Sequence, residues 1–366
     1  MRHVIEVLHG LRPVILMILV QIIYTGMNVF YKLAANDGMN MRILVAYRWI
    51  FASAFTIPLA LFIERKNRPN FSWGLLWLAF LSGLFGGTLS QNLYVESLIV
   101  TSATFAAAIA NLTPAVTLIL AVFLGYEKLG LKTGVGKAKT LGTLIGIGGA
   151  MLITLYRGVE LKLWSTNVHL LKAKASAQNG HVSSNYIVGF VTAFGSCVCY
   201  AVWLMIQTKM SKIYPLHYTN AALTSIMASI QCVVFSVCSQ RNWSHWKLGW
   251  NVRLLTVFYS GIINSGLVLT FIAWCVYMRG AVFVASFSPL SLVLIAIIAS
   301  LLLQEQLHLG SVVGAALIVC GLYMVLWGQC KEMKEKAKLV PTQNENELID
   351  IQVVSDSSLS KKHQHS

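Results

Sequence analysis

The sequence predicts an all-α membrane protein with ten transmembrane helices, arranged as two inverted five-helix repeats. Three observations lead to this fold class. Of the 366 residues, 56% are hydrophobic and only 11% are charged, whereas soluble domains carry about 25% charged residues. The apolar residues form separate blocks of the length that a helix needs to cross a bilayer. Finally, the second half of the chain repeats features of the first half.

Ten apolar blocks give the expected helices in order. They lie at residues 13–34, 43–63, 73–95, 100–123, 140–156, 186–207, 218–239, 253–274, 281–303 and 309–328. A β-barrel is excluded, because its strands would be segments of about ten residues with alternating polarity. The first block is longer than a secretory signal and a second hydrophobic segment follows it at once, so we expect it to be retained as a span.

Basic residues indicate the orientation of the chain. The net charge is +15, but the lysines and arginines lie in short loops beside the spans, without the basic stripe and interleaved aromatics of a nucleic-acid surface. They concentrate at the N-terminus, in alternate loops and in the C-terminal tail. The positive-inside rule therefore places both termini in the cytosol. We expect the bilayer as a partner and no nucleic acid.

The repeats define the expected domains. Placing Gly83 on Gly261 also aligns Glu127 with Glu305, and after a short shift two glycines of the fifth block meet two of the tenth. Five spans per repeat insert the second copy from the opposite side of the membrane. The expected parts are a cytosolic N-terminus (1–12), a first repeat (13–156), a non-cytosolic linker (157–185), a second repeat (186–328) and a disordered cytosolic tail (329–366).

Proline interrupts the fourth and ninth blocks, in the stretches NLTPAV and SFSPLS. Pro114 cannot donate a backbone hydrogen bond and crowds the carbonyl four residues earlier. Such a break is tolerated in a membrane where side chains or a watered cavity satisfy the freed groups. Asn111 and Thr113 stand beside Pro114, and Ser288 stands beside Pro289. We expect the two related breaks to line one central, uncharged pocket for a polar solute; a simple kink in each helix is the alternative.

Further polar and aromatic side chains recur at helical spacing on the first, third and eighth blocks, with a weaker signal on the sixth. Such side chains either bind a solute or hydrogen-bond a neighbouring helix, which contributes about 0.6 kcal/mol per bond. The candidate substrate-binding residues are Gln21, Tyr24, Asn28, Thr88, Gln91, Asn111, Thr113, Trp203, Asn264, Phe271, Trp274 and Ser288.

Charged residues are missing from the centres of the blocks, so passive or potential-driven movement fits better than a buried proton relay. The candidate gate or vestibule residues are Arg48, Glu96, Glu127 and Glu305. One hypothesis is an Arg48–Glu96 ion pair in the outer vestibule; the other is that each side chain snorkels to the headgroups separately. Glu127 and Glu305 fall on opposite faces, where they either gate the path or cap helix ends.

We expect no metal site, no cofactor and no enzymatic activity. The seven cysteines lie within or beside the apolar blocks without a zinc-binding spacing, and His363 and His365 do not form a metal site. The sequence has no HExxH motif, no GxSxG elbow and no pair of acids inside the membrane.

Several stretches identify a family. NLTPAVTLILAVFLGYEKL, GKAKTLGTLIGIGGAMLITLYRG and FSPLSLVLIAIIASLLLQEQLHLGSVVGAALIVCGLYMVLWG resemble the plant branch of the drug/metabolite transporter superfamily. Its members are the nodulin-like EamA-domain proteins, also called WALLS ARE THIN-related or UMAMIT transporters. The resemblance implies ten helices in two EamA units and facilitated, often bidirectional, movement of amino acids across the plasma or vacuolar membrane. The sequence departs from the family at Ala281, where relatives commonly have proline.

The resulting expectation is a carrier of a small solute, an amino acid first of all, that works by alternating access of a midplane site. A carrier of auxin or another small organic metabolite is the first alternative, since aromatic side chains offer stacking surfaces. A membrane receptor or scaffold that binds without transport is the second. The oligomeric state is left open by the sequence.

Overall fold

The computed structural model describes residues 2–64, 72–100, 106, 109–127, 133–156, 160–161, 186–239, 246–249, 251–302, 307–310 and 312–332. Within these residues, eight helices are long and apolar enough to cross a membrane. Two shorter apolar helices, Thr113–Phe123 and Ala281–Ile295, lie at the fourth and ninth predicted spans. The fold is an all-helical membrane fold, and the expected ten spans are compatible with it.

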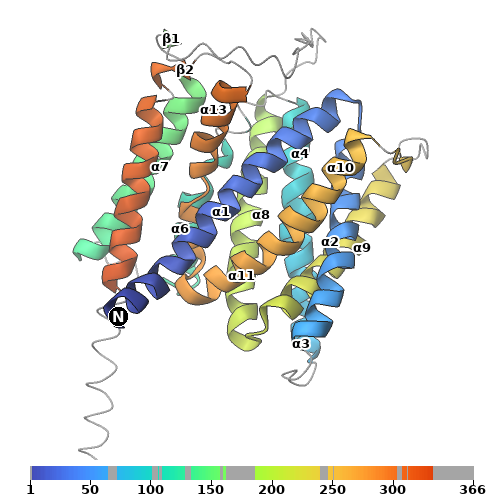
Figure 1. Ribbon diagram of the computed structural model, residues 1–366, viewed down its shortest axis with the longest axis horizontal. Coiled ribbons are helices and arrows are strands. Elements are labelled where there is room, and N and C mark those ends of the chain that lie inside the picture. Colours follow the sequence, from blue (N-terminus) through green and yellow to red (C-terminus); the bar gives the residue numbers. More distant parts are fainter. Residues whose placement is uncertain are drawn as a thin grey trace, which may run out of the picture.

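The helices of the two halves follow the same order (Figure 1). The first half contains α1 (Arg2–Asn36), α2 (Met41–Ile63), α3 (Trp73–Ser82), η1 (Gly83–Leu89), α4 (Ser90–Val100), α6 (Thr113–Phe123) and α7 (Gly134–Leu155). The second half contains α8 (Tyr186–Ile213), α9 (His217–Ser239), α10 (Val252–Phe258), η3 (Tyr259–Leu267), α11 (Val268–Arg279), α12 (Ala281–Ser286), α13 (Leu290–Leu302) and a C-terminal helix (Val312–Glu332).

The two ends of the bundle are distinct. The helix α1 begins at the same end of the bundle at which the C-terminal helix finishes (Figure 1), and we call this the terminal end. At the opposite end, the linker end, β1 (Glu160–Leu161) pairs antiparallel with β2 (Leu307–His308). This short pairing is the described part of the predicted linker. The last helix runs to Glu332, so the first residues of the expected tail are helical and the rest of the tail lies outside the described residues.

Local capping explains where several helices begin. The side chains of Asn40, Ser72 and Thr133 precede α2, α3 and α7 and accept hydrogen bonds from backbone N–H groups of the first turn. These residue types satisfy helix N-termini that have no partner within the helix. Between α11 and α12, Gly280 adopts a φ of 85°, which lets the chain reverse its direction at the terminal end.

The third and fourth helices of each half are distorted at matching positions. The π-helical segments η1 and η3 interrupt the third helix of the two halves, beginning near Gly83 and Gly261, which the sequence alignment pairs. Turns replace the helix at 111–112 and at 287–289. At the first of these turns, the Thr113 hydroxyl donates to the Ala110 carbonyl over 2.5 Å. A polar side chain thus satisfies a carbonyl that Pro114 leaves without a helical partner.

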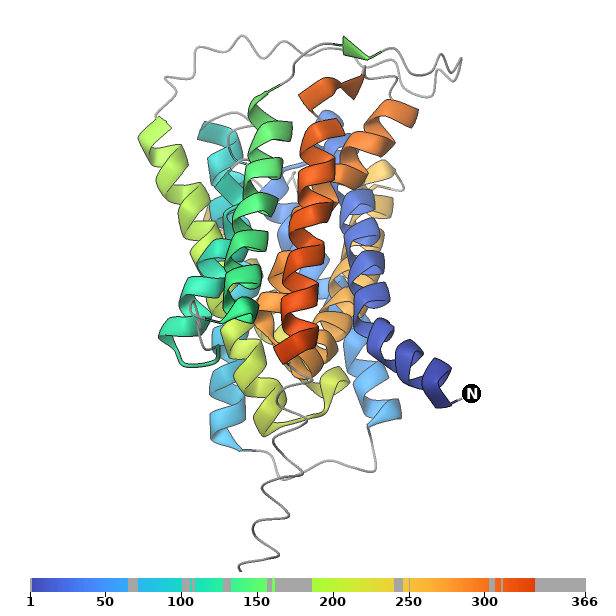
Figure 2. The ribbon, with the colours of Figure 1, turned by 90° about the vertical axis from the view of Figure 1, so that its left-hand side faces the viewer.

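Glycines set the contact between the fifth helices of the two halves, α7 and the C-terminal helix, which lie side by side in Figure 2. A Cβ atom built on Gly142 would lie 2.7 Å from the Gly321 carbonyl oxygen, and one built on Gly149 would lie 2.7 Å from the Gly314 carbonyl oxygen. The pairing runs in opposite directions along the two helices, so they pack antiparallel. Because these are the glycines that the repeat alignment matches, the crossing shows the inverted relation of the two halves.

The core lies between the halves, and the outer wall is apolar. The main cluster of buried side chains combines Trp49 of α2 and Trp203 of α8 with Phe283 and Phe287 near the second break. Large hydrophobic side chains such as Trp73 and Phe123 are exposed on the outside. An apolar exterior of this extent is expected where lipid is the solvent.

Candidate solute site between the two repeats

A small polar cavity lies between the two halves, and we call it the central cavity. Its volume is about 30 Å³, and its lining residues are Tyr24, Arg48, Trp49, Gly86 and Gln91 of the first half and Tyr200, Trp203, Asn264, Ser265, Val268, Leu269 and Ile272 of the second. Tyr24, Trp203 and Asn264 stand near the middle of the spans Leu11–Ala35, Ile187–Ile213 and Val252–Arg279. The central cavity therefore lies near the midplane of the predicted bilayer.

Arg48 is the charged group of this cavity. Its residue is only 5% exposed. The guanidinium donates through Nε to the Ser265 hydroxyl, and through Nη1 to the Tyr31 hydroxyl over 3.1 Å and to the Gln91 amide oxygen over 3.5 Å. These partners come from three different elements, and all of them are neutral. The hydrogen bonds fix the orientation of the guanidinium without neutralising its charge.

Five carboxylates have side chains that the structure describes, and they are engaged elsewhere. Glu96 pairs with Arg42, Asp37 pairs with Arg253, Glu127 and Glu332 pair with Lys139, and Glu64 accepts from backbone N–H groups at the start of α9. None of the thirteen acidic residues of the sequence falls inside the ten apolar blocks. An arginine can always be taken as charged, and a buried charge without a partner costs several kcal/mol. The central cavity is thus electrostatically suited to an anionic group.

Two residues that line this cavity, Trp49 and Asn264, each carry a buried polar atom without a hydrogen-bond partner among the described residues. These atoms are Nε1 of Trp49, a donor, and Oδ1 of Asn264, an acceptor. The two residues are 4% and 2% exposed, respectively. Unsatisfied buried polar atoms are rare and costly, so a donor and an acceptor in the same cavity favour a ligand with groups of both kinds.

Aromatic residues form another part of the wall. Tyr24 of α1 and Tyr200 of α8 bring one tyrosine from each half to this wall. The rings of Tyr200 and Trp203 lie 5.1 Å apart between centroids. Trp203 donates its indole N–H to the Ser82 hydroxyl over 3.1 Å. Its N–H is therefore occupied, and its ring contributes an apolar surface to the cavity.

The central cavity brings together four of the predicted substrate-binding residues, Tyr24, Gln91, Trp203 and Asn264, with one predicted vestibule residue, Arg48. The expectation of an uncharged pocket was therefore wrong. Trp49, Tyr200 and Ser265 were missed by the sequence reasoning. Ser265 directly follows Asn264 and could have been included, whereas no signal in the sequence distinguishes Tyr200 from other aromatic residues of the spans.

The remaining candidates on the polar stripes lie elsewhere. Asn28 is exposed and donates to the Tyr24 carbonyl of its own helix. Thr88 lies against α9, where its hydroxyl contacts Gln231 and Cys232. Six other candidates do not line the central cavity either. Gln21 is buried, and Phe271 and Trp274 are partly buried. Ser288, Asn111 and Thr113 lie near the breaks.

The two prolines meet in a different place. Pro114 and Pro289 are both buried and line one cavity of about 10 Å³ together with Gly142, Gly146, Ser286 and Gly321. This cavity shares no lining residue with the central cavity. The breaks are therefore brought together inside the bundle, as their repeat positions suggested, but the prediction that they line the pocket of the polar stripes was wrong.

Ion pairs hold the linker end together. Arg42 of α2 bonds to Glu96 of α4 and donates to the Ser239 hydroxyl of α9 over 2.5 Å. Arg253 of α10 bonds to Asp37, which follows α1, over 2.5 Å. The hypothesis of an Arg48–Glu96 pair was therefore wrong, because Glu96 contacts Arg42 instead.

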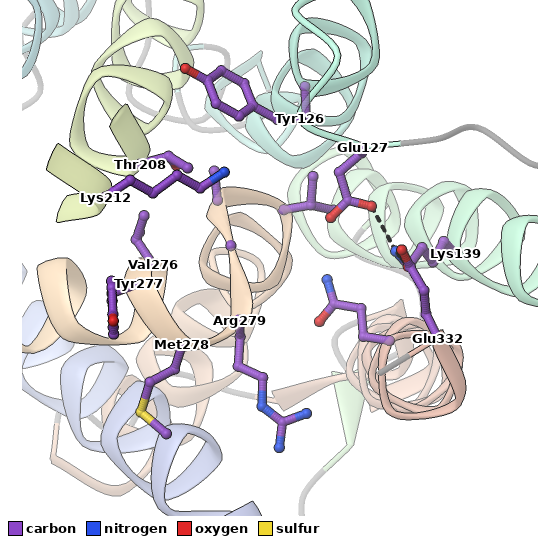
Figure 3. A pocket seen from close by; sticks show the side chains of 15 residues that line it. Tyr126, Glu127, Lys139, Thr208, Lys212, Val276, Tyr277, Met278, Arg279 and Glu332 are labelled. Atoms are coloured by element: carbon purple, nitrogen blue, oxygen red, sulfur yellow. Dashed lines mark hydrogen bonds and ion pairs between the residues drawn. The ribbon is translucent and has the colours of Figure 1, made fainter. Parts of the chain in front are cut away.

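A second cavity, of about 230 Å³, lies at the terminal end (Figure 3). On one side, Lys139 bonds to Glu127 over 2.6 Å and also to Glu332. On the opposite side, Lys212 extends toward the interior of the cavity in Figure 3, and its ammonium lies 5.2 Å from the centroid of the Tyr126 ring. Glu127 thus links α6, α7 and the C-terminal helix through Lys139. Glu305, its predicted counterpart, lies outside the described residues.

Two repeated helical units that enclose a buried polar site near mid-membrane define this protein as a multi-pass membrane transporter. A model of the EamA-like transporter family matches residues 11–155 and 187–327. The chain belongs to this family.

Individual relatives agree with this assignment. The chain is 41% identical to WAT1-related protein At1g25270 of Arabidopsis thaliana over 93% of this chain and 97% of the relative. It is 42% identical to WAT1-related protein At1g68170 of the same plant, over 92% of this chain and 94% of the relative. A solved crystal structure with 16% sequence identity covers 86% of this chain and 96% of its own, with a TM-score of 0.63. That last similarity concerns the fold alone.

Proposed function

We propose that this transporter is a bidirectional facilitator of amino acids, which reach the central cavity from the two sides of the membrane in turn. The observation that carries the proposal is Arg48, a buried cation between the two halves with no carboxylate partner among the described residues. A solute carboxylate supplies the missing charge. The proposal is also supported by the family to which the chain belongs.

The polar atoms of the cavity match a zwitterion. The carboxylate binds the Nη2 group of Arg48, for which no hydrogen bond is present among the described residues, and the neighbouring Nε1 donor of Trp49. The ammonium group donates to Oδ1 of Asn264. The side chain of the solute packs on Trp203 and Leu269. A basic amino acid would bring a second positive charge into a site without an acid, so neutral amino acids are the favoured substrates.

Alternating access follows from the size of the cavity. A water molecule needs about 10–15 Å³ of such space, so a cavity of about 30 Å³ holds a few waters and cannot hold an amino acid. The two halves must move apart for the solute to enter. Opening at the linker end requires separation of the Arg42–Glu96 and Arg253–Asp37 pairs. The terminal-end cavity gives the inner route.

The proposed mechanism needs no proton relay. No acidic residue lies inside the apolar blocks, and a carboxyl group in the membrane is the usual carrier of the coupled proton. Movement then follows the concentration gradient of the solute. The excess of lysine and arginine at the terminal end supports cytosolic termini, and the family resemblance supports the plasma membrane or the vacuolar membrane as its location.

A carrier of auxin is the second candidate. The observation in its favour is the pair of rings, Tyr200 and Trp203, beside Arg48, which together suit an aromatic carboxylic acid. Such a solute has no ammonium group for Asn264. Replacement of Asn264 by leucine should therefore impair amino-acid flux more than auxin flux.

The decisive experiment is tracer flux in liposomes that contain the purified full-length protein. Leucine, glutamate, lysine and auxin are compared with and without a pH gradient. Loss of one partner of a buried charge pair costs about 2–5 kcal/mol, so Arg48→Gln should lower kcat/KM for leucine by roughly 30-fold or more. Lys247→Gln, which changes an exposed lysine, is the matched control and should retain the flux.

Three outcomes contradict the proposal. Undiminished leucine flux in Arg48→Gln would remove the site. Flux that requires the pH gradient would remove the facilitator mechanism. Binding of leucine without any flux would indicate a receptor or scaffold.

A further inference from the structure

The charge of Arg48 has to be balanced in the empty carrier as well as in the loaded one. We propose that the central cavity binds a small monovalent inorganic anion, chloride in a cell, when it holds no solute. The inference rests on the proposed function because the anion and the solute share the same site. Binding of the anion can nevertheless be measured without any transport.

The donors of the cavity support an anion of this kind. Arg48 keeps Nη2 available, since the hydrogen bonds of the described residues use Nε and Nη1. Trp49 offers a buried N–H that has no partner among the described residues. Tyr24 and Tyr200 also line the cavity, and each carries a hydroxyl group that is able to donate. Halides bind to N–H and O–H donors without a need for directed lone pairs.

Size and charge limit the choice of anion. The central cavity of about 30 Å³ has room for two or three water molecules, and one monatomic ion can take their place. Sulfate or phosphate is larger and would bring two negative charges to one guanidinium. The acceptor Oδ1 of Asn264 shares the cavity, so the anion lies on the side of Arg48 and Trp49.

Competition with the solute is the functional consequence. The carboxylate of an incoming amino acid takes the same donors, so the halide must leave when the solute binds. Chloride should raise KM for leucine without lowering kcat, and at ten times its dissociation constant it should raise KM roughly tenfold. The carrier would then release an inorganic anion on the side where it loads the solute.

Thermal unfolding of the purified full-length protein tests the binding. The midpoint temperature Tm is measured in sodium chloride and in sodium methanesulfonate, whose anion is too large for the cavity, at equal ionic strength. Chloride should raise Tm by about 2–4 °C, and above the dissociation constant the rise should grow with the logarithm of the chloride concentration. Iodide should give a saturable quenching of tryptophan fluorescence that chloride reverses by competition, because Trp49 and Trp203 line the cavity.

Two variants locate the ion. Arg48→Gln removes the cation and should abolish the chloride-dependent rise in Tm. Asn264→Asp keeps the shape of the side chain but supplies a carboxylate within the cavity, so it should fold and yet lose the response to chloride. Lys247→Gln should keep the full response.

The inference is overturned if Tm is the same in the two salts, or if Asn264→Asp keeps the chloride response of the parent protein. These results are separate from the test of the proposed function. Leucine flux without a chloride effect would leave the amino-acid carrier intact and remove only the anion, whereas a chloride effect without amino-acid flux would do the reverse.

Discussion

The glycine contact between α7 and the C-terminal helix gives a prediction with a magnitude. A Cβ at Gly142 would lie 2.7 Å from the carbonyl oxygen of Gly321 and 2.9 Å from Cβ of Met324. A carbon–oxygen contact needs about 3.3 Å, so Gly142→Ala forces the two helices apart by roughly 0.6 Å at this crossing. Overpacking of this kind costs about 1–3 kcal/mol, while the better helix propensity of alanine offsets up to about 1 kcal/mol. We expect a net loss of about 1–2 kcal/mol.

The same helix offers a matched control. Gly148 is exposed, and a Cβ atom added there would have no atom within 4 Å, so Gly148→Ala should be neutral or slightly stabilising. Thermal unfolding of the purified protein in nanodiscs, followed by tryptophan fluorescence, measures both variants. Gly142→Ala should lower Tm by about 2–4 °C relative to Gly148→Ala. Equal Tm values for the two variants would refute the close antiparallel packing.

A double variant sharpens this test. Gly149 makes the corresponding close contact at the other crossing point, where its Cβ would lie 2.7 Å from the Gly314 carbonyl oxygen. One displacement of the helix relieves both clashes. The double variant Gly142→Ala/Gly149→Ala should therefore lose less stability than the sum of the two single losses. Strict additivity would indicate two independent local rearrangements.

Three further predictions concern charges and topology. Arg42→Glu and Glu96→Arg should each lower the flux, because each breaks the ion pair between these residues. The double variant Arg42→Glu/Glu96→Arg restores the pair with reversed charges and should restore the flux. A double variant no better than the single variants would argue that the pair does not close the linker end. Lys139→Gln should lower the free energy of unfolding by about 1–3 kcal/mol, measured by thermal unfolding, because it removes the buried ammonium group that bonds to both Glu127 and Glu332. An unchanged Tm would contradict this. An impermeant thiol reagent outside intact cells should label Cys238 at the linker end and spare Cys330 at the terminal end, and the reverse labelling would invert the proposed orientation.

The positions of the helices and their distortions were predictable because their causes are local. The length of each apolar block depends on bilayer thickness, and a proline breaks a helix wherever it stands within it. The turns at 111–112 and 287–289 accordingly lie at matching positions of the two repeats. The alignment also matches Gly142 with Gly314 and Gly149 with Gly321, but it did not predict that these four glycines contact one another, as Gly142 does with Gly321 and Gly149 with Gly314. The helical residues up to Glu332 were not expected, since the composition of the tail gave no boundary there.

The site was predicted only in part, because it depends on how the helices are rotated about their axes. Arg42 and Arg48 both lie in the first half of α2 and are six residues apart. This spacing rotates the second side chain by about 240° around the helix axis relative to the first, after one full turn. Arg42 therefore faces Glu96 and Ser239, while Arg48 faces the cavity between the halves. No pattern within the sequence of α2 specifies which neighbour meets each face.

The sequence by itself determined the membrane class, the two repeats, the helix breaks and the family, since each depends on composition, on spacing or on residue types along the chain. Only the tertiary structure decided that Arg48 is buried without a carboxylate partner among the described residues and that the prolines and the polar stripes line separate cavities. The physical reason is that the partner of a charge is a property of packing between helices. Hydropathy and periodicity describe one helix at a time.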